Sequence, residues 1–308
     1  MGKKYNQIGY LCCWFSGVLV LGISVLIIIY LAVKGIGVIN WQFLTESPQP
    51  SLNEALSGGI FSPIIGTVLL TAMGILISLP WALATAIYLS EYAEEDNHWV
   101  NTLRTGIDVL SGVPTIVFAI FGLAIFTHPA LALFSTMVEG VQNAKAFGRS
   151  FFVGSITMAM MVLPFVAKSI EESIRAVPLS FKEAAFSLGI SKLCTISRVV
   201  VPAAKAGIIT GVILGIGRIA GDTAIVWLCL GGSMDFTGKQ PWYEPGNWLA
   251  TLKNTGSTLT SYIYYSSPAG EGNSPNKAFG AGLVLIILIL VLNSIVDYLG
   301  RFTRLKED

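Results

Sequence analysis

Charged residues are scarce in this chain of 308 residues. Asp, Glu, Lys and Arg together make up 12% of it, while hydrophobic residues make up 53%. Soluble domains carry about 25% charged residues, and they rarely contain long runs without any charge. The composition therefore indicates an integral membrane protein. A net charge of +1 also lacks the basic excess that is typical of proteins that bind nucleic acids.

Residues that build catalytic and metal centres are equally scarce. The only histidines are His98 and His128, and the sequence contains neither H-E-x-x-H nor the nucleotide-binding pattern G-x4-G-K-[ST]. The four cysteines have neither zinc-ligand spacing nor the pattern of a secreted disulfide framework, so we interpret them as small apolar packing residues. We therefore expect no catalytic residue, no metal site and no cofactor.

Six hydrophobic runs are long enough to cross a membrane as helices. They cover residues 8–33, 60–90, 109–127, 150–167, 206–234 and 278–296. The first run is too long for a signal peptide and has no convincing cleavage site, so we expect it to be retained. The sequence thus predicts an all-α membrane protein with six transmembrane helices. Residues 1–59 would form the first helix and an external loop, residues 60–300 the main transmembrane domain with five helices, and residues 301–308 a tail.

Positive charges predict how these helices are oriented. Six spans place both termini on the same side of the membrane. Of the 19 Lys and Arg residues, twelve fall on the side of the termini and six on the other, and Arg218 lies inside a hydrophobic run. Cytoplasmic loops carry the excess of positive charge, so both termini are expected in the cytoplasm.

A short polar segment between the fourth and fifth runs reads as a separate amphipathic helix over residues 181–188. Ser180 and Glu183 have the spacing of a capping box, and Gly189 falls where a helix would end in a left-handed conformation. Two turns are not stable alone in water, so the helix needs a surface to lie on. The residues leave open whether that surface belongs to this protein or to a groove on another one.

This segment resembles the EAA loop of ABC-importer permeases, whose pattern is E-A-A-x3-G-x9-I-x-L-P. Seven positions follow the pattern, two of them with valine in place of isoleucine or leucine: Glu183, Ala184, Ala185, Gly189, Val199, Val201 and Pro202. The resemblance implies that residues 181–189 form a coupling helix that docks into an ATPase subunit.

The third hydrophobic run is interrupted at residues 111–115, from Ser111 to Thr115. Gly112 permits close approach of another backbone, and Pro114 removes a backbone donor. Irregular backbone at membrane depth is tolerated only beside protein or a wet cavity. An ordinary proline kink at the start of a helix is equally compatible with this sequence.

Arg218 lies about 18 Å along the fifth run, near the middle of a membrane. A lone charge there costs roughly 2.5–3.5 kcal/mol on the lenient insertion scale. Asp222 follows four residues later, the spacing at which two side chains face each other on a helix. Gly207, Gly211 and Gly215 precede them on the same stripe, so we expect the pair to point into the helix bundle. It is either a structural salt bridge or a site that binds an anion, because arginine presents a planar fork of donors.

The segment around this pair resembles the R-x-x-G-E-T-A signature of phosphate-importer permeases of the PstA type. The matching residues are Arg218, Gly221, Asp222, Thr223 and Ala224, with aspartate in place of the usual glutamate. The resemblance covers about residues 58–300 and implies the type I, MetI-like permease fold. It also implies that the chain is the permease subunit of an ATP-driven phosphate importer in the inner membrane and has no ATPase site of its own.

The same resemblance implies the partners and the substrate pathway. The partners would be a second, PstC-like permease subunit, a dimer of ATP-binding subunits and an extracytoplasmic phosphate-binding protein. The expected pathway residues are Ser111, Thr115, Arg218, Asp222 and Thr223. Permeases for sulfate, molybdate or phosphonate remain alternatives, since Arg218 suits any oxyanion. A membrane enzyme that acts on lipid phosphates is disfavoured, because it would need a nucleophile, base or metal cluster near the pair.

Overall fold

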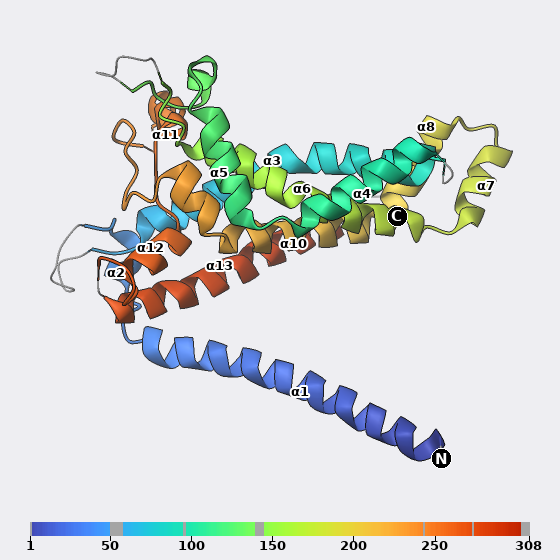
Figure 1. Cartoon of the computed structure of the whole chain (residues 1–308), viewed down its shortest axis with the longest axis horizontal. Coiled ribbons are helices and arrows are strands. Elements are labelled where there is room, and N and C mark those ends of the chain that lie inside the picture. The colour runs from blue at the N-terminus through green and yellow to red at the C-terminus, as the bar shows by residue number, and fades with distance from the viewer. Residues whose placement is uncertain are drawn as a thin grey trace.

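A computed structural model describes residues 2–49, 58–94, 97–138, 145–242, 244–272 and 274–302 (Figure 1). Nearly all of these residues are helical, and the described ranges contain two isolated β-bridges but no strand. The expected all-α fold is confirmed. Most of the expected tail, residues 303–308, and part of the expected external loop, residues 50–57, lie outside the described residues.

Four continuous helices of the described part are long and apolar enough to cross a membrane. They are α1 (Gly2–Gly35), α3 (Phe61–Ile87), α6 (Phe151–Arg175) and α13 (Pro275–Phe302). Two bent pairs of helices raise the number of spans to six when each pair counts as one. The first pair is α4 (His98–Gly112) and α5 (Thr115–Phe126), bent by 100°. In the second, the segment Lys192–Ala203 meets α10 (Lys205–Gly221) at 67°.

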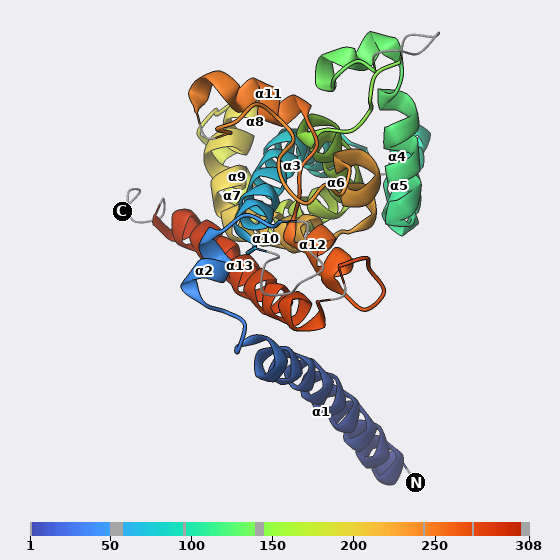
Figure 2. The same cartoon turned by 90° about the vertical axis from the view of Figure 1, so that its left-hand side faces the viewer.

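The bundle is built around α3 and α6, with α10 packed against both (Figures 1 and 2). Glycines on α10 permit this packing, as their stripe predicts. A Cβ added at Gly207 would overlap the side chain of Ser173 on α6, and one at Gly215 would lie 2.8 Å from Cδ1 of Ile75 on α3. The glycine stripe therefore faces the interior of the bundle.

The two ends of the bundle carry different short helices (Figure 1). One end holds α2 (Trp41–Thr45), α11 (Trp248–Lys253) and α12 (Leu259–Ser266). The other end holds α7 (Leu179–Ser187) and α8 (Lys192–Thr195), together with the start of α1 and the end of α13. The start of α1 and the end of α13 thus lie at the same end as α7, as an even number of spans requires.

Two of the predicted spans differ from the structure. The third was expected over residues 109–127, but its first helix begins at His98 and continues to Gly112 before the chain turns. The fifth was expected over residues 206–234, but α10 ends at Gly221. A separate helical segment, which contains the π-helix η5 (Val226–Leu230), follows it. Hydropathy alone did not reveal this second break, because both sides of it are apolar.

Candidate functional site

The break between α4 and α5 lies at Val113 and Pro114. Both residues adopt extended backbone conformations, with ψ values of 129° and 140°. Proline cannot donate the backbone hydrogen bond that would continue α4, and a bend of 100° is far larger than an ordinary kink. Of the two alternatives that the sequence left open, the structure therefore shows irregular backbone and not an ordinary proline kink. The hydroxyl of Ser111 donates to the Asp108 carbonyl of its own helix at 2.7 Å.

A second break separates α10 from the segment that follows it. Asp222 has an extended backbone (φ −77°, ψ 136°), and its carboxylate Oδ1 accepts a hydrogen bond from the backbone N–H of Ile225 at 2.8 Å. The hydroxyl of Thr260 on α12 donates to the Asp222 carbonyl at 3.0 Å. The expectation that Asp222 faces Arg218 from the same helix was wrong. A short carboxylate is a strong N-cap, and here it caps the next helical segment.

Arg218 is held by uncharged groups. Its Nε donates to the sulfur of Met161 at 3.1 Å, and its guanidinium carbon lies 3.5 Å from the centroid of the Phe165 ring, both on α6. The described residues include no ion pair between Arg218 and Asp222, and no other hydrogen bond of this guanidinium. The structural salt bridge, one of the two alternatives that the sequence left open, is therefore not found among the described residues, and the guanidinium keeps donors for another partner.

The two breaks meet in space. Thr115, at the start of α5, lies close enough to interact with the Asp222 carboxylate, and Arg218 lies within electrostatic reach of it. The structure therefore brings together Thr115, Arg218 and Asp222 from the predicted set. It does not bring the Ser111 hydroxyl into a contact with them, because that hydroxyl is bonded within α4.

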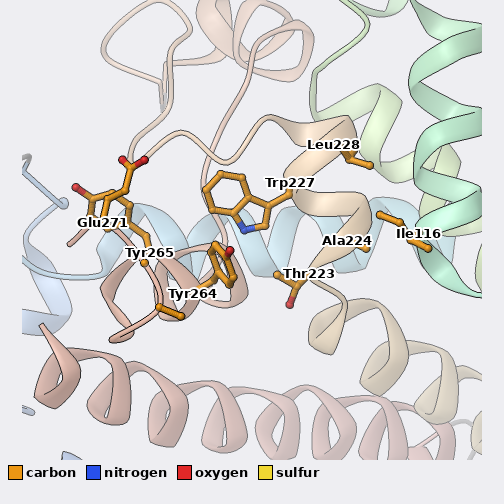
Figure 3. A pocket seen from close by; sticks show the side chains of 10 residues that line it. Ile116, Thr223, Ala224, Trp227, Leu228, Tyr264, Tyr265 and Glu271 are labelled. Carbon is orange, nitrogen blue, oxygen red and sulfur yellow. The ribbon is translucent and has the colours of Figure 1, made fainter. Parts of the chain in front are cut away.

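A cavity of about 780 Å³ is lined by the start of α5, the segment after the second break, α12 and the loop after α12 (Figure 3). Thr223, Ala224 and Ile116 line one end of it, and Glu271 lines the other. Between them the rings of Trp227 and Tyr264 meet edge to face, with centroids 5.2 Å apart. The sequence singled out Thr223 but gave no signal for the aromatic residues beyond their abundance.

The helix α7 occupies the segment expected to dock on a partner. It begins at Leu179, and no side chain caps it, so the predicted capping box of Ser180 and Glu183 was wrong. The preceding Pro178 has φ −56° and ψ 137°, which is the backbone conformation of an N-cap, so Ser180 already lies inside the first turn.

The end of α7 agrees with the sequence. Gly189 has φ +75°. Its N–H donates to the Phe186 carbonyl at 2.9 Å, and the N–H of Ile190 donates to the Ala185 carbonyl at 3.2 Å. These two bonds form a Schellman motif, in which glycine supplies the left-handed residue.

One face of α7 is covered and the rest is open. Ala185 is buried, whereas Glu183 and Ala184 are exposed. Four large apolar side chains of this segment are also exposed: Leu179, Phe181, Phe186 and Leu188. Pro202 is exposed in α9 (Val201–Ala203), just before the 67° bend into α10. Clustered exposed apolar side chains of this kind mark interaction surfaces.

Sequence reasoning missed one buried ion pair that involves α7. The acidic residues in 91–96 are by themselves typical of a solvated turn, but the Glu91 side chain is only 8% exposed and lies 2.5 Å from the ammonium of Lys182. The partners are 91 residues apart, so no local spacing signals the pair. Residues 95 and 96 lie outside the described part. Among the described residues, no group of His, Cys, Asp or Glu could hold a metal ion.

The chain matches a family model described as "Binding-protein-dependent transport system inner membrane component" over residues 95–305. It is 32% identical to the phosphate transport system permease protein PstA of Mycobacterium leprae, with 83% of this chain and 75% of the relative covered. It is 28% identical to the probable ABC transporter permease protein YqgI of Bacillus subtilis, with 90% and 88% covered.

Solved structures share the fold. A bacterial alginate ABC transporter, in complex with an alginate pentasaccharide-bound periplasmic protein, superposes with a TM-score of 0.60 at 16% identity and covers 97% of both chains. The MetNI methionine ABC transporter, in an inward-facing conformation, gives a TM-score of 0.54 at 15% identity and covers 79% of this chain and 93% of its own. At these identities the likeness shows the architecture alone.

Proposed function

Because the chain belongs to the family of binding-protein-dependent transport system inner membrane components, we propose that it is a transmembrane permease subunit of an ATP-driven importer of inorganic phosphate. The name of its PstA relative supports the choice of phosphate. The chain contains no nucleotide-binding sequence motif, so ATP is hydrolysed by a separate subunit.

The observation that carries this proposal is the environment of Arg218. An ionisable side chain within a transmembrane helix marks a candidate functional site, and Arg218 forms no ion pair among the described residues. Here only a thioether and an aromatic ring hold it, and the breaks at Pro114 and Asp222 lie beside it. Discontinuous helices form substrate sites in many transporters, because their ends present unpaired backbone groups to a cavity. The planar fork of arginine suits the oxygens of phosphate.

The other predicted pathway residues have distinct roles in this proposal. Asp222 holds the second break open through its bond to Ile225 and accepts a hydrogen bond from hydrogen phosphate. Thr115 and Thr223 supply hydroxyl groups beside it, and Ser111 lies at the first break. A fully ionised oxyanion such as sulfate has no proton to donate, so a carboxylate at this place disfavours it.

Partner subunits complete the transporter in this proposal. Residues 60–300 form the permease domain, preceded by a first helix and loop in residues 1–59. Both termini and α7 face the cytoplasm. The exposed face of α7, with Glu183, Ala184 and the Gly189 cap, docks into a dimer of ATP-binding subunits, and Pro202 sets the bend behind it. A second, PstC-like permease and an extracytoplasmic phosphate-binding protein complete the complex.

Reconstitution tests the substrate. The chain is coexpressed with the second permease and the ATP-binding subunit, and the complex is placed in liposomes with the binding protein. Inorganic phosphate is expected to stimulate ATP hydrolysis, and sulfate at the same concentration is expected not to. Stimulation by sulfate alone would assign the other oxyanion, and cleavage of lipid phosphates by the isolated chain would make it an enzyme.

Thiol labelling tests the orientation. A cysteine at Lys192, beside α7, should react with an impermeant maleimide only from the cytoplasmic side. A cysteine at Lys253, at the end of α11, should react only from outside. Each is introduced after Cys12, Cys13 and Cys194 have been replaced by serine. Reaction of both positions from one side would contradict the topology.

A further inference from the structure

The short segment that ends α3 is contacted by side chains from four other helices. This segment, η2 (Tyr88–Tyr92), is a π-helix, in which the N–H of Ala93 bonds to the carbonyl of Tyr88 at 2.9 Å. The wider turn leaves the Leu89 carbonyl available to side chains. Single π-turns within helices occur frequently at functional sites.

Two arginines bind this carbonyl. Nη2 of Arg104 on α4 donates to the Leu89 carbonyl at 2.9 Å, and Nη2 of Arg175 on α6 donates to it at 3.5 Å. The same two arginines share the carboxylate of Glu171, at 3.4 Å and 3.1 Å. Backbone, arginines and carboxylate form a closed ring that ties η2 to α4 and α6.

The remaining contacts lead to the segment with α7. The Lys182 ammonium on α7 lies 2.5 Å from Glu91, and the two side chains are 15% and 8% exposed. The Lys192 ammonium on α8 lies 4.6 Å from the centroid of the Tyr92 ring. In the described part of the chain, the Lys182 bond is the only hydrogen bond or ion pair that joins an α7 side chain to another helix.

We propose that Glu91 is the positioning residue that, through Lys182, makes α7 move with α3 as one rigid body. The proposal rests on the proposed docking of α7 to the ATP-binding subunit. A buried ion pair resists separation, because each partner left alone would be an unpaired charge. Movement imposed on α7 therefore reaches η2, and the arginine ring passes it to α4 and α6.

Distances between spin labels test this rigidity without any transport measurement. Labels are placed at Ser187 on α7 and Ala84 on α3, both exposed, in the assembled complex with Cys12, Cys13 and Cys194 replaced by serine. With the pair intact, the distance distribution should stay the same when ATP binds. In Glu91→Gln it should broaden or shift on ATP binding. An unchanged distribution in Glu91→Gln would overturn the proposal.

The function of the complex gives the second measurement. Glu91→Gln and Lys182→Gln should each assemble with the ATP-binding subunit. Each should lower phosphate-stimulated ATP hydrolysis about tenfold, a typical magnitude for coupling between sites. Half-saturating phosphate should stay the same, because the pair lies at the α7 end of the bundle and contacts none of the residues around Arg218 (Figure 1). The exchanged pair, Glu91→Lys with Lys182→Glu, should recover most of the rate.

A matched control is present in the same structure. Lys168 and Asp108 also lie 2.5 Å apart and join α6 to α4, but they are 47% and 58% exposed and do not touch α7. Lys168→Gln should leave both the label distances and the stimulated hydrolysis unchanged. Equal defects in Lys168→Gln and Glu91→Gln, or no recovery in an assembled exchanged pair, would reject a specific role for Glu91.

The label distances also separate two kinds of failure. If no anion stimulates hydrolysis by the wild-type complex, the proposed function fails, but the comparison of label distances still decides whether Glu91 fixes α7. If the wild type responds to phosphate and Glu91→Gln responds equally with unchanged distances, only the inference about Glu91 fails.

Discussion

Charged side chains are held differently at the α7 end of the bundle and beside the helix breaks. At the α7 end, most charges around η2 meet an opposite charge: Lys182 meets Glu91, and Arg104 and Arg175 share Glu171, while Lys192 lies over the ring of Tyr92. Beside the breaks, Arg218 meets only a thioether and a ring, and Asp222 meets a backbone N–H.

This difference separates two uses of charge in a membrane protein. Opposite charges in contact fix the geometry of the side chains that carry them. Each charge also offsets much of the electrostatic potential of the other, so a paired charge attracts a third ion weakly. A charge held by neutral groups keeps its orientation and also keeps its attraction for a mobile ion. The α7 network is therefore suited to a mechanical role, and Arg218 is suited to binding an anion that arrives and leaves.

Removal of Arg218 should give the largest effect on transport. Arg218→Gln should assemble at near-normal abundance, because no ion pair is broken, but uptake of radiolabelled phosphate should fall about 100-fold, the scale of losing one preorganised charged donor. Arg218→Lys should also transport poorly, because an ammonium lacks the bidentate fork. Normal uptake by an assembled Arg218→Gln complex would show that the charge is dispensable. Loss of the protein in Arg218→Gln, reversed by adding Asp222→Asn, would instead reveal a structural pair.

Changes at Asp222 test the region beside the helix breaks further, because the carboxylate of this residue accepts a hydrogen bond at the second break. Asp222→Ala removes the acceptor for the Ile225 N–H and should destabilise the protein by about 1 kcal/mol, the usual cost of losing an N-cap. Asp222→Asn keeps an acceptor and should retain most of that stability while it weakens uptake. Thermal unfolding in detergent measures the first effect and transport assays the second. Equal melting temperatures for the two variants would contradict the capping role.

Substitution of Gly189, which ends α7, should destabilise the turn through the backbone conformation and not through steric overlap. A Cβ at Gly189 would meet no atom within 4 Å, but the residue has φ +75°. Gly189→Val should therefore cost about 1–2 kcal/mol locally, whereas Gly189→Asn should cost less, since asparagine tolerates the left-handed region. Copurification of the ATP-binding subunit should fall only with valine. Identical yields from the two variants would mean that the Schellman turn does not position the docking face.

The smallest effect is expected at the half-exposed pair of Lys168 and Asp108. Exposed ion pairs contribute little to stability, so Lys168→Gln should lower the melting temperature only slightly. Adding salt should reduce the difference between the variant and the wild type, because solvent ions screen exposed charges. A large loss of stability that persists at high salt would show that this pair is shielded from solvent ions, like the buried network around η2.

Local chemistry predicted several of these features. Pro114 and Gly189 act through their own backbones, so the first break and the end of α7 were predictable from residue type. The break at Asp222 was not, because aspartate at this place is compatible with a helix until Thr260 and Ile225 supply its alternative bonds. The start of α7 was missed by two residues because the conformation of Pro178 already serves as the cap. The pair of Glu91 and Lys182 depends on the whole fold.

The exposed surface of α1 has a consequence for how the protein is made. In the most apolar stretch of α1, no residue is buried against the rest of the chain. In the corresponding stretch of α6, 67% of the residues are buried. In both views α1 runs apart from the bundle over most of its length (Figures 1 and 2). A helix of this kind is stable in lipid without its neighbours, so α1 can leave the ribosome and enter the membrane as a finished unit. The helix α6, by contrast, completes its surroundings only after α3 and α10 have been synthesised and have packed against it.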